Sequence, residues 1–402
     1  MNAKSMASIA APLHFEDQIL EQGDLISKKL HLLSVQRFPP NAKKTLRSLS
    51  MAEVAEYVGV SQSTLKKLHL DGKGPSPQTS SSGRRSYTAT QMLELRQYLD
   101  AHGRSESRMY VPHRRGREKL QVLAVVNFKG GSGKTTTAAH LAQHLALTGH
   151  RVLAVDLDPQ ASLSSLHGFQ PELDQVSSIY DAIRYDAERR PLSEIIQPTN
   201  FPGLDIVPAN LDLQEYEYDT PVAMANKASN EGKTFFTRIS RALAEVDDRY
   251  DVVVIDCPPQ LGYLTLTALT AATSVLITIH PQMLDVMSMG QFLLMLGGIL
   301  KPIRAAGAEV NLSWYRYLIT RYEPTDVPQA QMVGFMSTMF HEFMLKNQML
   351  KSTAVSDAGI TKQTLYEVER ATMNRGTYDR ALESLSSVNR EIVELIHQSW
   401  GR

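Results

Sequence analysis

The sequence is poor in the features that would place it outside the cell or in a membrane. Of its 402 residues only one, Cys257, is a cysteine, which excludes a disulfide framework and a multi-cysteine metal site within one chain. The N-terminus lacks the basic and then apolar pattern of a secretion signal. The longest apolar stretches, such as Val286–Leu300, are broken by Ser, Gly and Gln and fall short of the length expected of a spanning helix. These absences predict a cytoplasmic protein with no membrane partner.

Net charge is absent as well, because 42 Lys and Arg residues balance 42 Asp and Glu residues. The total charge therefore gives no sign of a nucleic-acid partner, and its distribution matters more. Basic residues gather between Arg104 and Lys119. Such a run is compatible with a solvated linker and, equally, with a contact to the DNA backbone.

The N-terminal segment has the pattern of one long helix. From Leu13 to Val35 the apolar residues recur near helical spacing, and Phe38–Asn41 contains the two prolines that would end the helix. An isolated amphipathic helix cannot bury its own apolar stripe. We therefore expect it to pack on a partner chain or on the next domain.

Two further units follow along the chain. The unit from about Leu49 to Gly103 has a middle section, Gly72–Gly83, that is rich in Gly, Ser and Pro, as a turn or wing would be. From Leu120 onward, strand and helix patterns alternate to the C-terminus, which is typical of an α/β fold with a mostly parallel sheet and helices on both faces. The predicted organisation is an N-terminal helix (1–36), a helix-turn-helix domain (37–104), a basic linker (105–119) and an α/β domain (120–402).

A glycine-rich segment directly after the apolar strand Val122–Asn127 is the strongest signal. Residues 129–137 are Lys-Gly-Gly-Ser-Gly-Lys-Thr-Thr-Thr, and a helical pattern follows them. Glycines let successive backbone amides turn toward phosphate oxygens, and the helix N-terminus adds its dipole. Lys134 would contact the β and γ phosphates, and the Thr135 hydroxyl would ligate magnesium. The predicted phosphate cradle comprises Gly130, Gly131, Ser132, Gly133, Lys134, Thr135 and Thr136.

Two other apolar runs end in aspartate. Val252–Ile255 leads to Asp256, and Arg151–Val155 leads into Asp156-Leu157-Asp158-Pro159-Gln160. Acidic strand ends beside a phosphate loop suit metal contact and the positioning of water. With Thr135, the residues Asp156 and Asp256 form the predicted magnesium site.

These three motifs, with Asp256-Cys257-Pro258-Pro259, resemble the ParA/MinD branch of P-loop ATPases, whose loop has a deviant Walker A sequence with an extra lysine at its start. The resemblance covers roughly Gln121–Trp400 and is most specific up to Pro259, although Gln260 stands where many relatives have Ser or Thr. It implies that Lys129 reaches across an ATP-sandwich homodimer to the partner's phosphates. It also implies that Asp158 is the catalytic aspartate, and that Mg²⁺ accompanies ATP and ADP.

Two other members of that branch fit less well. Nitrogenase-type iron proteins bridge a cluster with cysteines from both subunits, and Cys257 alone does not supply the ligands that each subunit would need. MinD-like proteins end in a basic amphipathic membrane helix, whereas the last predicted helix, Arg390–Trp400, contains Glu391 and Glu394. The partition ATPases of the branch remain.

Residues Ser50–Leu68 fit a helix-turn-helix, for which a plain helical hairpin is the alternative. Ala55 is small where two helices cross, Gly59 permits the tight turn, and Ser61 can cap the second helix. The basic segment that follows resembles the wing of MerR-type regulators, and a wing contacts the phosphate backbone. The DNA-contacting residues predicted here are Gln62, Ser63, Lys66 and Lys67 on the second helix and Arg84 and Arg85 in the wing.

A deviant Walker ATPase behind such a domain resembles the long partition ATPases of low-copy plasmids, and especially the RepA proteins of repABC replicons. The resemblance implies a ParB-like centromere-binding partner, repression of the protein's own operon at operator DNA, and a dimerisation role for Leu13–Val35. It also places contacts to non-specific nucleoid DNA at Lys351 and Arg375.

The sequence therefore predicts a cytoplasmic, nucleoid-associated ATPase that segregates a low-copy replicon. Its turnover would be weak alone and stimulated by the partner and by DNA. One alternative is a transcriptional regulator whose nucleotide site is only a sensor, but a sensor needs no hydrolytic aspartate. Another is a chromosomal ATPase that positions a protein cargo, a group that usually lacks the winged helix.

Overall fold

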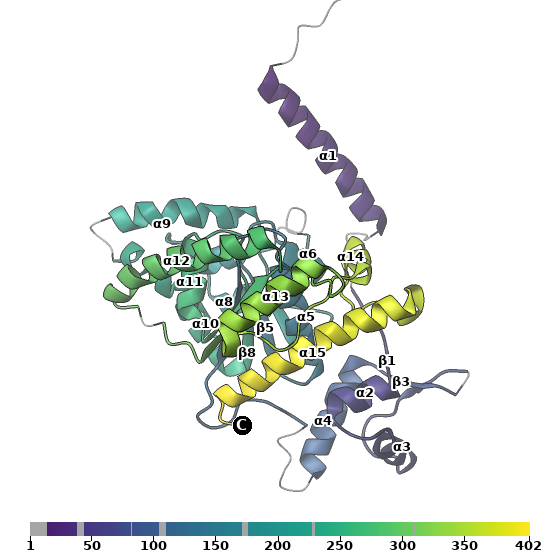
Figure 1. Cartoon of the computed structure of the whole chain (residues 1–402). Helices are drawn as coiled ribbons and strands as arrows, with labels where there is room; N and C mark the ends of the chain where they lie inside the picture. Colours follow the sequence, from purple (N-terminus) through teal and green to yellow (C-terminus); the bar gives the residue numbers. More distant parts are fainter. Residues whose placement is uncertain are drawn as a thin grey trace, which may run out of the picture. The chain divides into compact units, whose positions relative to one another are not determined.

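The computed structural model describes residues 14–37, 44–81, 83–103, 110–170, 176–226, 230–308 and 310–402. Leu13, the predicted helix stop Phe38–Asn41, and the basic residues Arg104 and Arg108 lie outside the described residues. The chain divides into two compact units, residues 1–44 and 45–402. Figure 1 labels helices and strands of the chain and colours them by residue number.

The first unit contains helix α1 (Phe15–Arg37), so the predicted N-terminal helix is confirmed in type and nearly in extent. Glu16 and Asp17 lie in its first turn, where a carboxylate favours the helix dipole. Its large apolar side chains, such as Phe15 at 75% and Ile26 at 59% exposure, are open to solvent in the single chain. The expected packing of this apolar surface on a partner chain or on the next domain stays a prediction.

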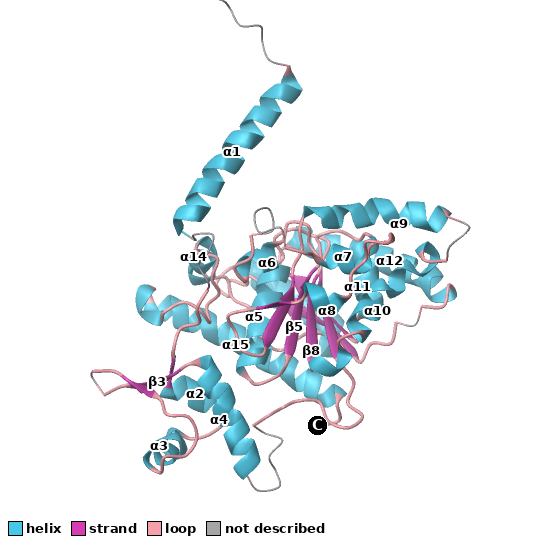
Figure 2. Ribbon diagram, turned by 180° about the vertical axis from the view of Figure 1, so that it is seen from behind, coloured by secondary structure: helices cyan, strands magenta, loops and turns pink. Residues whose placement is uncertain are grey.

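The second unit begins with a winged helix-turn-helix. A three-stranded antiparallel sheet of order β1-β3-β2 lies beside three helices, and the hairpin between β2 and β3 forms the wing. Figure 2 shows this hairpin projecting from the helices. The elements are β1 (Leu49–Ser50), α2 (Met51–Val58), α3 (Gln62–Leu70), β2 (Gln78–Thr79), β3 (Arg85–Tyr87) and α4 (Ala89–His102).

Local contacts fix the two helices of this motif, and Gly59 and Ser61 have the roles that the sequence predicted. Ser50 and Glu53 form a capping box at the start of α2. Gly59 ends α2 in the left-handed region, with φ of 77°, which glycine adopts without strain. The Ser61 hydroxyl accepts a hydrogen bond from the Thr64 amide at 3.1 Å and caps α3. The turn between α2 and α3 is therefore specified residue by residue.

The larger part of the second unit is built on a seven-stranded sheet of order β10-β9-β4-β8-β5-β7-β6. All neighbouring strands are parallel except β6 and β7, which confirms the predicted fold class. The strands are β4 (Gln121–Val126), β5 (Val152–Asp156), β6 (Gln197–Pro198), β7 (Leu204–Val207), β8 (Val252–Asp256), β9 (Ser274–Ile279) and β10 (Trp314–Ile319).

Helices cover both faces of this sheet, as Figure 2 shows. Along β4, Leu123 and Val125 belong to one hydrophobic core, whereas Val122 and Val126 belong to the other. Because both faces of the strand are buried, its sequence is a continuous apolar run rather than an alternating one. The helices are α5 (Lys134–Leu147), α6 (Ser162–Leu166), α7 (Ile179–Ile183), α8 (Leu192–Ile195), α9 (Glu215–Ala225), α10 (Arg238–Ala244), α11 (Tyr263–Ala271), α12 (Met283–Ala305), α13 (Val327–Phe340), α14 (Thr353–Ile360) and α15 (Arg375–Ser399), with short 3₁₀ turns η2 (Leu211–Gln214), η3 (Gly232–Thr237), η4 (Asp247–Arg249), η5 (His341–Phe343) and η6 (Arg370–Thr372).

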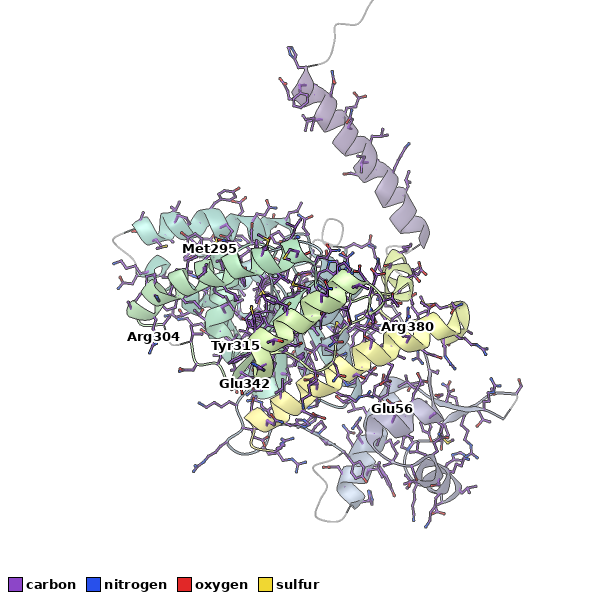
Figure 3. The ribbon with its side chains drawn as sticks, viewed as in Figure 1. Glu56, Met295, Arg304, Tyr315, Glu342 and Arg380 are labelled. Carbon is purple, nitrogen blue, oxygen red and sulfur yellow. The ribbon has the colours of Figure 1, made fainter. Side chains whose placement is uncertain are left out.

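Two helices are longer than the sequence indicated. The last helix, α15, has 25 residues and begins at Arg375 rather than at Arg390. Helix α12 has 23 residues and is long and apolar enough to cross a membrane, so the expectation that this region falls short of a spanning length was wrong. The Ser, Gly and Gln residues within it do not interrupt a helix. The buried residues of α12 are Val286, Met289, Phe292 and Ile303, while Met295 is 57% exposed (Figure 3).

Helix α5, which follows the glycine-rich loop, is buried along nearly its whole length and is unusually polar inside. The His140 Nε2 atom accepts a hydrogen bond from the Leu365 amide at 3.3 Å, and the Gln143 Oε1 atom accepts one from the Thr364 hydroxyl at 2.5 Å. The Asn389 amide of α15 donates to the His140 carbonyl at 3.2 Å. These hydrogen bonds join α5 to the C-terminal segment. The bond that the His140 ring accepts requires this histidine to be neutral.

We expect the stability of the fold to fall steeply on acidification. Burial lowers the pKa of His140 to about 4, and those of His144 and His150 to about 3. Below the ordinary pKa of histidine, these three side chains bind protons in the unfolded chain but remain neutral in the folded chain. Each of these residues therefore costs up to about 1.4 kcal/mol of unfolding free energy per pH unit between pH 6.5 and about 4. Urea unfolding curves at pH 7.5, 6 and 5 measure the slope.

His144→Gln should make that slope shallower, whereas His102→Gln, a change at an exposed position, should leave it unchanged. A wild-type unfolding free energy that stays constant from pH 7.5 to pH 5 would contradict the burial of neutral histidines.

Candidate functional site

The glycine-rich loop between β4 and α5 is shaped to receive phosphate. Gly131 and Gly133 have φ values of 76° and 84°, in the left-handed region that glycine tolerates. A Cβ atom on Gly133 would lie 3.4 Å from the Cβ of Thr320. Gly133 also precedes α5 without a side-chain cap, so the amides of the first turn of α5 remain available to an anion.

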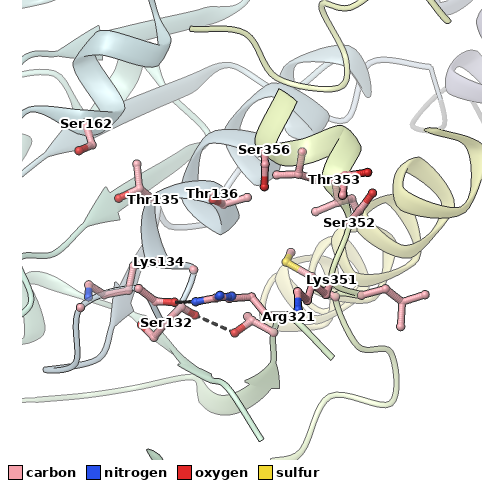
Figure 4. A pocket seen from close by; sticks show the side chains of 18 of the residues that line it. Ser132, Lys134, Thr135, Thr136, Ser162, Arg321, Lys351, Ser352, Thr353 and Ser356 are labelled. Atoms are coloured by element: carbon pink, nitrogen blue, oxygen red, sulfur yellow. Dashed lines mark hydrogen bonds between the residues drawn. The ribbon is translucent and has the colours of Figure 1, made fainter. Parts of the chain in front are cut away.

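Neighbouring strand ends hold this loop in place. The Thr320 hydroxyl donates to the Ser132 carbonyl at 2.7 Å, and the Arg321 guanidinium donates to the Gly131 carbonyl at 3.0 Å (Figure 4). The Ser132 hydroxyl lies 3.0 Å from that of Thr278 at the end of β9. Because these contacts use the loop carbonyls, they leave its amides for a ligand.

Lys134 directly follows the loop as the first residue of α5 and is 6% exposed. Its ammonium group donates to the Lys129 carbonyl at 3.1 Å. Burial lowers the pKa of Lys134, while the nearby Asp256 carboxylate raises it. A buried cation beside uncapped amides is the arrangement that binds the β and γ phosphates of a nucleotide.

Asp256 provides the strongest sign of a metal. Both of its carboxylate oxygens are buried and accept no hydrogen bond of normal geometry from the described residues. Burial raises the pKa of Asp256 well above its usual value, Asp156 raises it further, and Thr135 and Lys134 lower it. A buried carboxylate without partners costs free energy unless a cation or water satisfies it. The residues Thr135 and Asp256 therefore fit Mg²⁺ with its bound water, which would neutralise charge on the phosphates.

Asp156 lies directly beside Asp256 in the register of β5 and β8. Its carboxylate is already occupied, because it accepts hydrogen bonds from the Asp158 amide at 3.1 Å and from the amide and hydroxyl of Ser164, each at 2.8 Å. These bonds fix the loop from Asp158 to Ser164. A metal contact by Asp156 stays a prediction. In the structure, the Asp156 carboxylate positions Asp158 through the hydrogen bond from the Asp158 amide.

Asp158 faces the phosphate loop across a cavity of about 860 Å³. The Oδ1 atom of Asp158 accepts a hydrogen bond from the Gln160 amide at 3.0 Å, which makes a tight turn before α6. Ala161 completes this turn with φ of 52°, an uncommon conformation for a residue other than glycine. The strained turn holds a carboxylate at the opening of the nucleotide site.

Lys129, at the start of the loop, points away from Lys134. Its ammonium group forms an ion pair with Asp285 of α12, with an Nζ–Oδ1 distance of 2.6 Å, and its side chain is 42% exposed. The His280 imidazole lies 3.7 Å from the other Asp285 oxygen. The single chain therefore holds this lysine outside its own phosphate cradle.

The sequence did not predict the opposite wall of the cavity. Thr320, Arg321 and Glu323 follow β10, and further lining residues come from the segment 349–352 and from the first turn of α14. Figure 4 shows Lys351, Ser352, Thr353 and Ser356 across the cavity from Lys134 and Thr135. Polar residues after the carboxyl end of a parallel strand were the available signal, because ligands bind at that edge of such sheets.

The predicted DNA-contacting residues lie in three places. Gln62, Ser63, Lys66 and Lys67 are exposed on α3, and Arg84 is exposed at the end of the wing while Arg85 is half-buried. Arg375 is exposed in the first turn of α15. Lys351 instead lies at the rim of the nucleotide cavity and forms an ion pair with Glu323 at 2.8 Å.

Comparisons with known proteins match two parts of the chain to known families. Residues 120–306 match the AAA domain family, and residues 49–101 match the MerR helix-turn-helix family of regulatory proteins. Replication protein A of Sinorhizobium fredii is 82% identical over 100% of this chain and 99% of its own length. SopA of Escherichia coli K12 is 28% identical over 96% of this chain and 97% of its own length. A solved partition protein shares the fold, with a TM-score of 0.59 and 17% identity over 95% of this chain and 99% of that chain.

The loop, the two aspartate-terminated strands and the winged helix define a P-loop ATPase joined to a MerR-type DNA-binding domain. The chain belongs to the RepA family of replication and partition proteins, within the wider family of SopA and ParA partition ATPases.

Proposed function

We propose that this protein hydrolyses ATP to segregate a low-copy plasmid or replicon with a ParB-like partner bound at the centromere, and that it represses its own operon through the winged helix. The observation that supports the proposal is the combination, on one chain, of a glycine-rich phosphate loop flanked by carboxylates with an exposed recognition helix. The site has a buried Lys134, an Asp158 that lines the same cavity, and an Asp256 whose buried oxygens accept no hydrogen bond of normal geometry from the described residues.

Each site residue has a distinct task in this proposal. The loop amides and Lys134 bind the phosphates, and Thr135 and Asp256 hold magnesium, which supplies charge neutralisation on the transferred phosphate. Asp158 would orient the attacking water, because it lines the same cavity as the phosphate loop. Lys129 leaves Asp285 and reaches the phosphates of a second copy, so that ATP joins the two chains.

ATP binding would favour contact with non-specific nucleoid DNA, and hydrolysis stimulated by the centromere-bound partner would release it. The Arg375 side chain and, once released from Glu323, the Lys351 side chain would contact the DNA backbone. Operator DNA would be read by α3, which lies in a separate part of the same unit. Helix α1 would join two copies through its exposed apolar residues.

A nucleotide sensor without hydrolysis is the competing function. It would need the phosphate cradle but not a carboxylate held in a strained turn at its opening. The deciding experiment measures ATP turnover by the purified chain alone, with bulk DNA, and with both DNA and the product of the neighbouring gene. We expect weak turnover that rises in that order. The absence of turnover in every mixture, with ATP still bound, would favour the sensor.

Lys129→Ala should still bind nucleotide but should remain unable to join two copies or to hydrolyse ATP. The phosphate cradle does not include the Lys129 ammonium group, which is bound to Asp285 in the single chain. Sedimentation with a non-hydrolysable ATP analogue measures dimerisation, and calorimetry measures binding. Wild-type turnover by this variant would show that the deviant lysine has no catalytic role.

Lys351→Ala and Arg375→Ala should each weaken ATP-dependent binding to DNA of any sequence and should reduce the salt slope by about one unit. Operator binding through α3 should survive, because neither residue lies on the winged helix. Lys346→Ala, another exposed lysine of this region, is the matched control. Equal losses of operator binding and non-specific binding would mean that the protein binds both kinds of DNA through the same surface.

A further inference from the structure

The winged helix does not form a separate core of its own. Leu65, Met92 and Leu95 belong to the same hydrophobic core as Leu141 and Leu145 of α5, the helix that begins at the phosphate loop. A domain that shares its core with a neighbour cannot turn independently without exposing apolar surface. The recognition helix is therefore built onto the nucleotide domain.

A buried arginine lies at the centre of this joint. Arg96 of α4 is 2% exposed, and its guanidinium group donates to the Tyr57 carbonyl, to the Tyr110 carbonyl at 3.0 Å and to the Leu147 carbonyl at 3.2 Å. All the acceptors that the structure describes are backbone carbonyls. Tyr57 lies in the last turn of α2, and Leu147 ends α5. Two helix C-termini thus converge on one cation, which complements both dipoles.

The surroundings of Arg96 are shaped around its side chain. A Cβ atom on Gly149, whose φ is 98°, would lie 2.9 Å from the Arg96 Cδ atom. Burial lowers the pKa of Arg96 to about 10, so the group stays charged at neutral pH. A second link lies at the surface, where Arg390 of α15 forms an ion pair of 3.2 Å with Glu56 of α2. Glu56 is labelled in Figure 3. Helix α2, which sets the direction of α3, is thereby held against both α5 and α15.

A rigid joint between the winged helix and the nucleotide domain affects how a dimer of this protein would bind DNA. Two recognition helices bind a two-fold operator only when they are about 34 Å apart, or a multiple of this spacing. If each helix is fixed to its own nucleotide domain, this spacing is set by how the two nucleotide domains are arranged. A loosely attached helix would instead adjust to the DNA in any arrangement.

We infer that Arg96 is a positioning residue that fixes the recognition helix to the nucleotide domain, so that operator affinity depends on the nucleotide-controlled arrangement of the dimer. The inference rests on the proposed function, because it requires operator binding by α3 and nucleotide-dependent pairing of two copies. It adds the physical link between them, which joins the C-terminus of α5 to α2 and α4.

The test compares wild type with Arg96→Met, which has a similar length but no donor groups, and with Arg96→Lys, which keeps the charge. The probe is the DNA upstream of the protein's own gene, and its affinity is measured without nucleotide, with ADP and with a non-hydrolysable ATP analogue. For wild type we expect affinities that differ about tenfold between the best and worst nucleotide states, within the usual range of coupling between two sites.

Arg96→Met should reduce this ratio of operator affinities to about twofold while ATP turnover stays near that of wild type. Arg96→Lys should restore part of the ratio, and Arg117→Met, at an exposed position, should leave it unchanged.

A folded Arg96→Met protein that keeps the wild-type ratio would overturn the inference. If Arg96→Met does not fold, Gly149→Ala replaces it, since its methyl group would displace the Arg96 side chain, and an unchanged ratio there has the same meaning. Failure of the wild type to bind the upstream DNA in any nucleotide state would instead count against the proposed repressor function.

Discussion

Replacing Lys134 with alanine is expected to weaken ATP binding by about a hundredfold, or about 3 kcal/mol. The Lys134 ammonium group is buried and donates to the Lys129 carbonyl. Burial lowers the pKa of Lys134, and the nearby Asp256 carboxylate offsets part of this effect. Nucleotide phosphates would therefore lose their nearest buried cation, and the Asp256 carboxylate would lose its positive neighbour. Isothermal calorimetry with ATP and magnesium measures the change directly.

The variant must be shown to fold before the loss of binding is assigned to the loop. Thermal unfolding without nucleotide serves this purpose, and the wild-type protein should gain thermal stability with ATP while Lys134→Ala should not. Lys346→Ala, a change of the same chemistry at an exposed site, should bind ATP as wild type does. Wild-type affinity in a folded Lys134→Ala protein would mean that the assigned loop does not bind the phosphates.

Removal of the Asp158 carboxylate should abolish turnover without loss of ATP affinity. A group that orients the attacking water acts mainly in the transition state, so its loss costs rate rather than ground-state binding. We expect a decrease in partner-stimulated turnover of about 10²–10⁴-fold. The variant should close the ATP dimer, remain on bulk DNA and fail to segregate the replicon, while repression persists.

The local structure offers a matched pair of variants for this prediction. The Oδ1 atom of Asp158 also accepts the Gln160 amide at 3.0 Å, so Asp158→Ala removes both a turn contact and a carboxylate. Asp158→Asn keeps an oxygen for the turn but loses the negative charge. If turnover depends on the carboxylate, both variants are inactive and Asp158→Asn has normal thermal stability. If Asp158→Asn retains full turnover, Asp158 only shapes the turn.

The parts of the site that the sequence predicted are those encoded by neighbouring residues. The loop from Gly130 to Thr136 and the aspartate at the end of β8 lie where the motif and the strand pattern placed them. The helix-turn-helix could be predicted for the same reason, because Gly59 and Ser61, which determine its turn, are close together in the sequence. Motifs of this kind need no knowledge of the tertiary fold.

The contacts that sequence reasoning missed join residues far apart in the chain. The partner of Lys129 is Asp285, and the far wall of the cavity is formed by Arg321 and Glu323, which no local motif marks. The acceptors of Arg96 are backbone carbonyls, and a carbonyl has no residue type that a sequence pattern could reveal. The occupied carboxylate of Asp156 likewise depends on Ser164, a serine with nothing distinctive in its sequence context.

The single thiol of the chain has a practical consequence for measuring dimer geometry. Cys257 is fully buried beside Asp256, and burial raises the pKa of its thiol. Maleimide reagents attack exposed thiolates, so the folded native protein should remain unlabelled. A cysteine introduced at exposed Gln62 would then be the one reactive site on each copy. Fluorophores attached there would report the distance between two recognition helices by energy transfer, in each nucleotide state and without removal of the native cysteine.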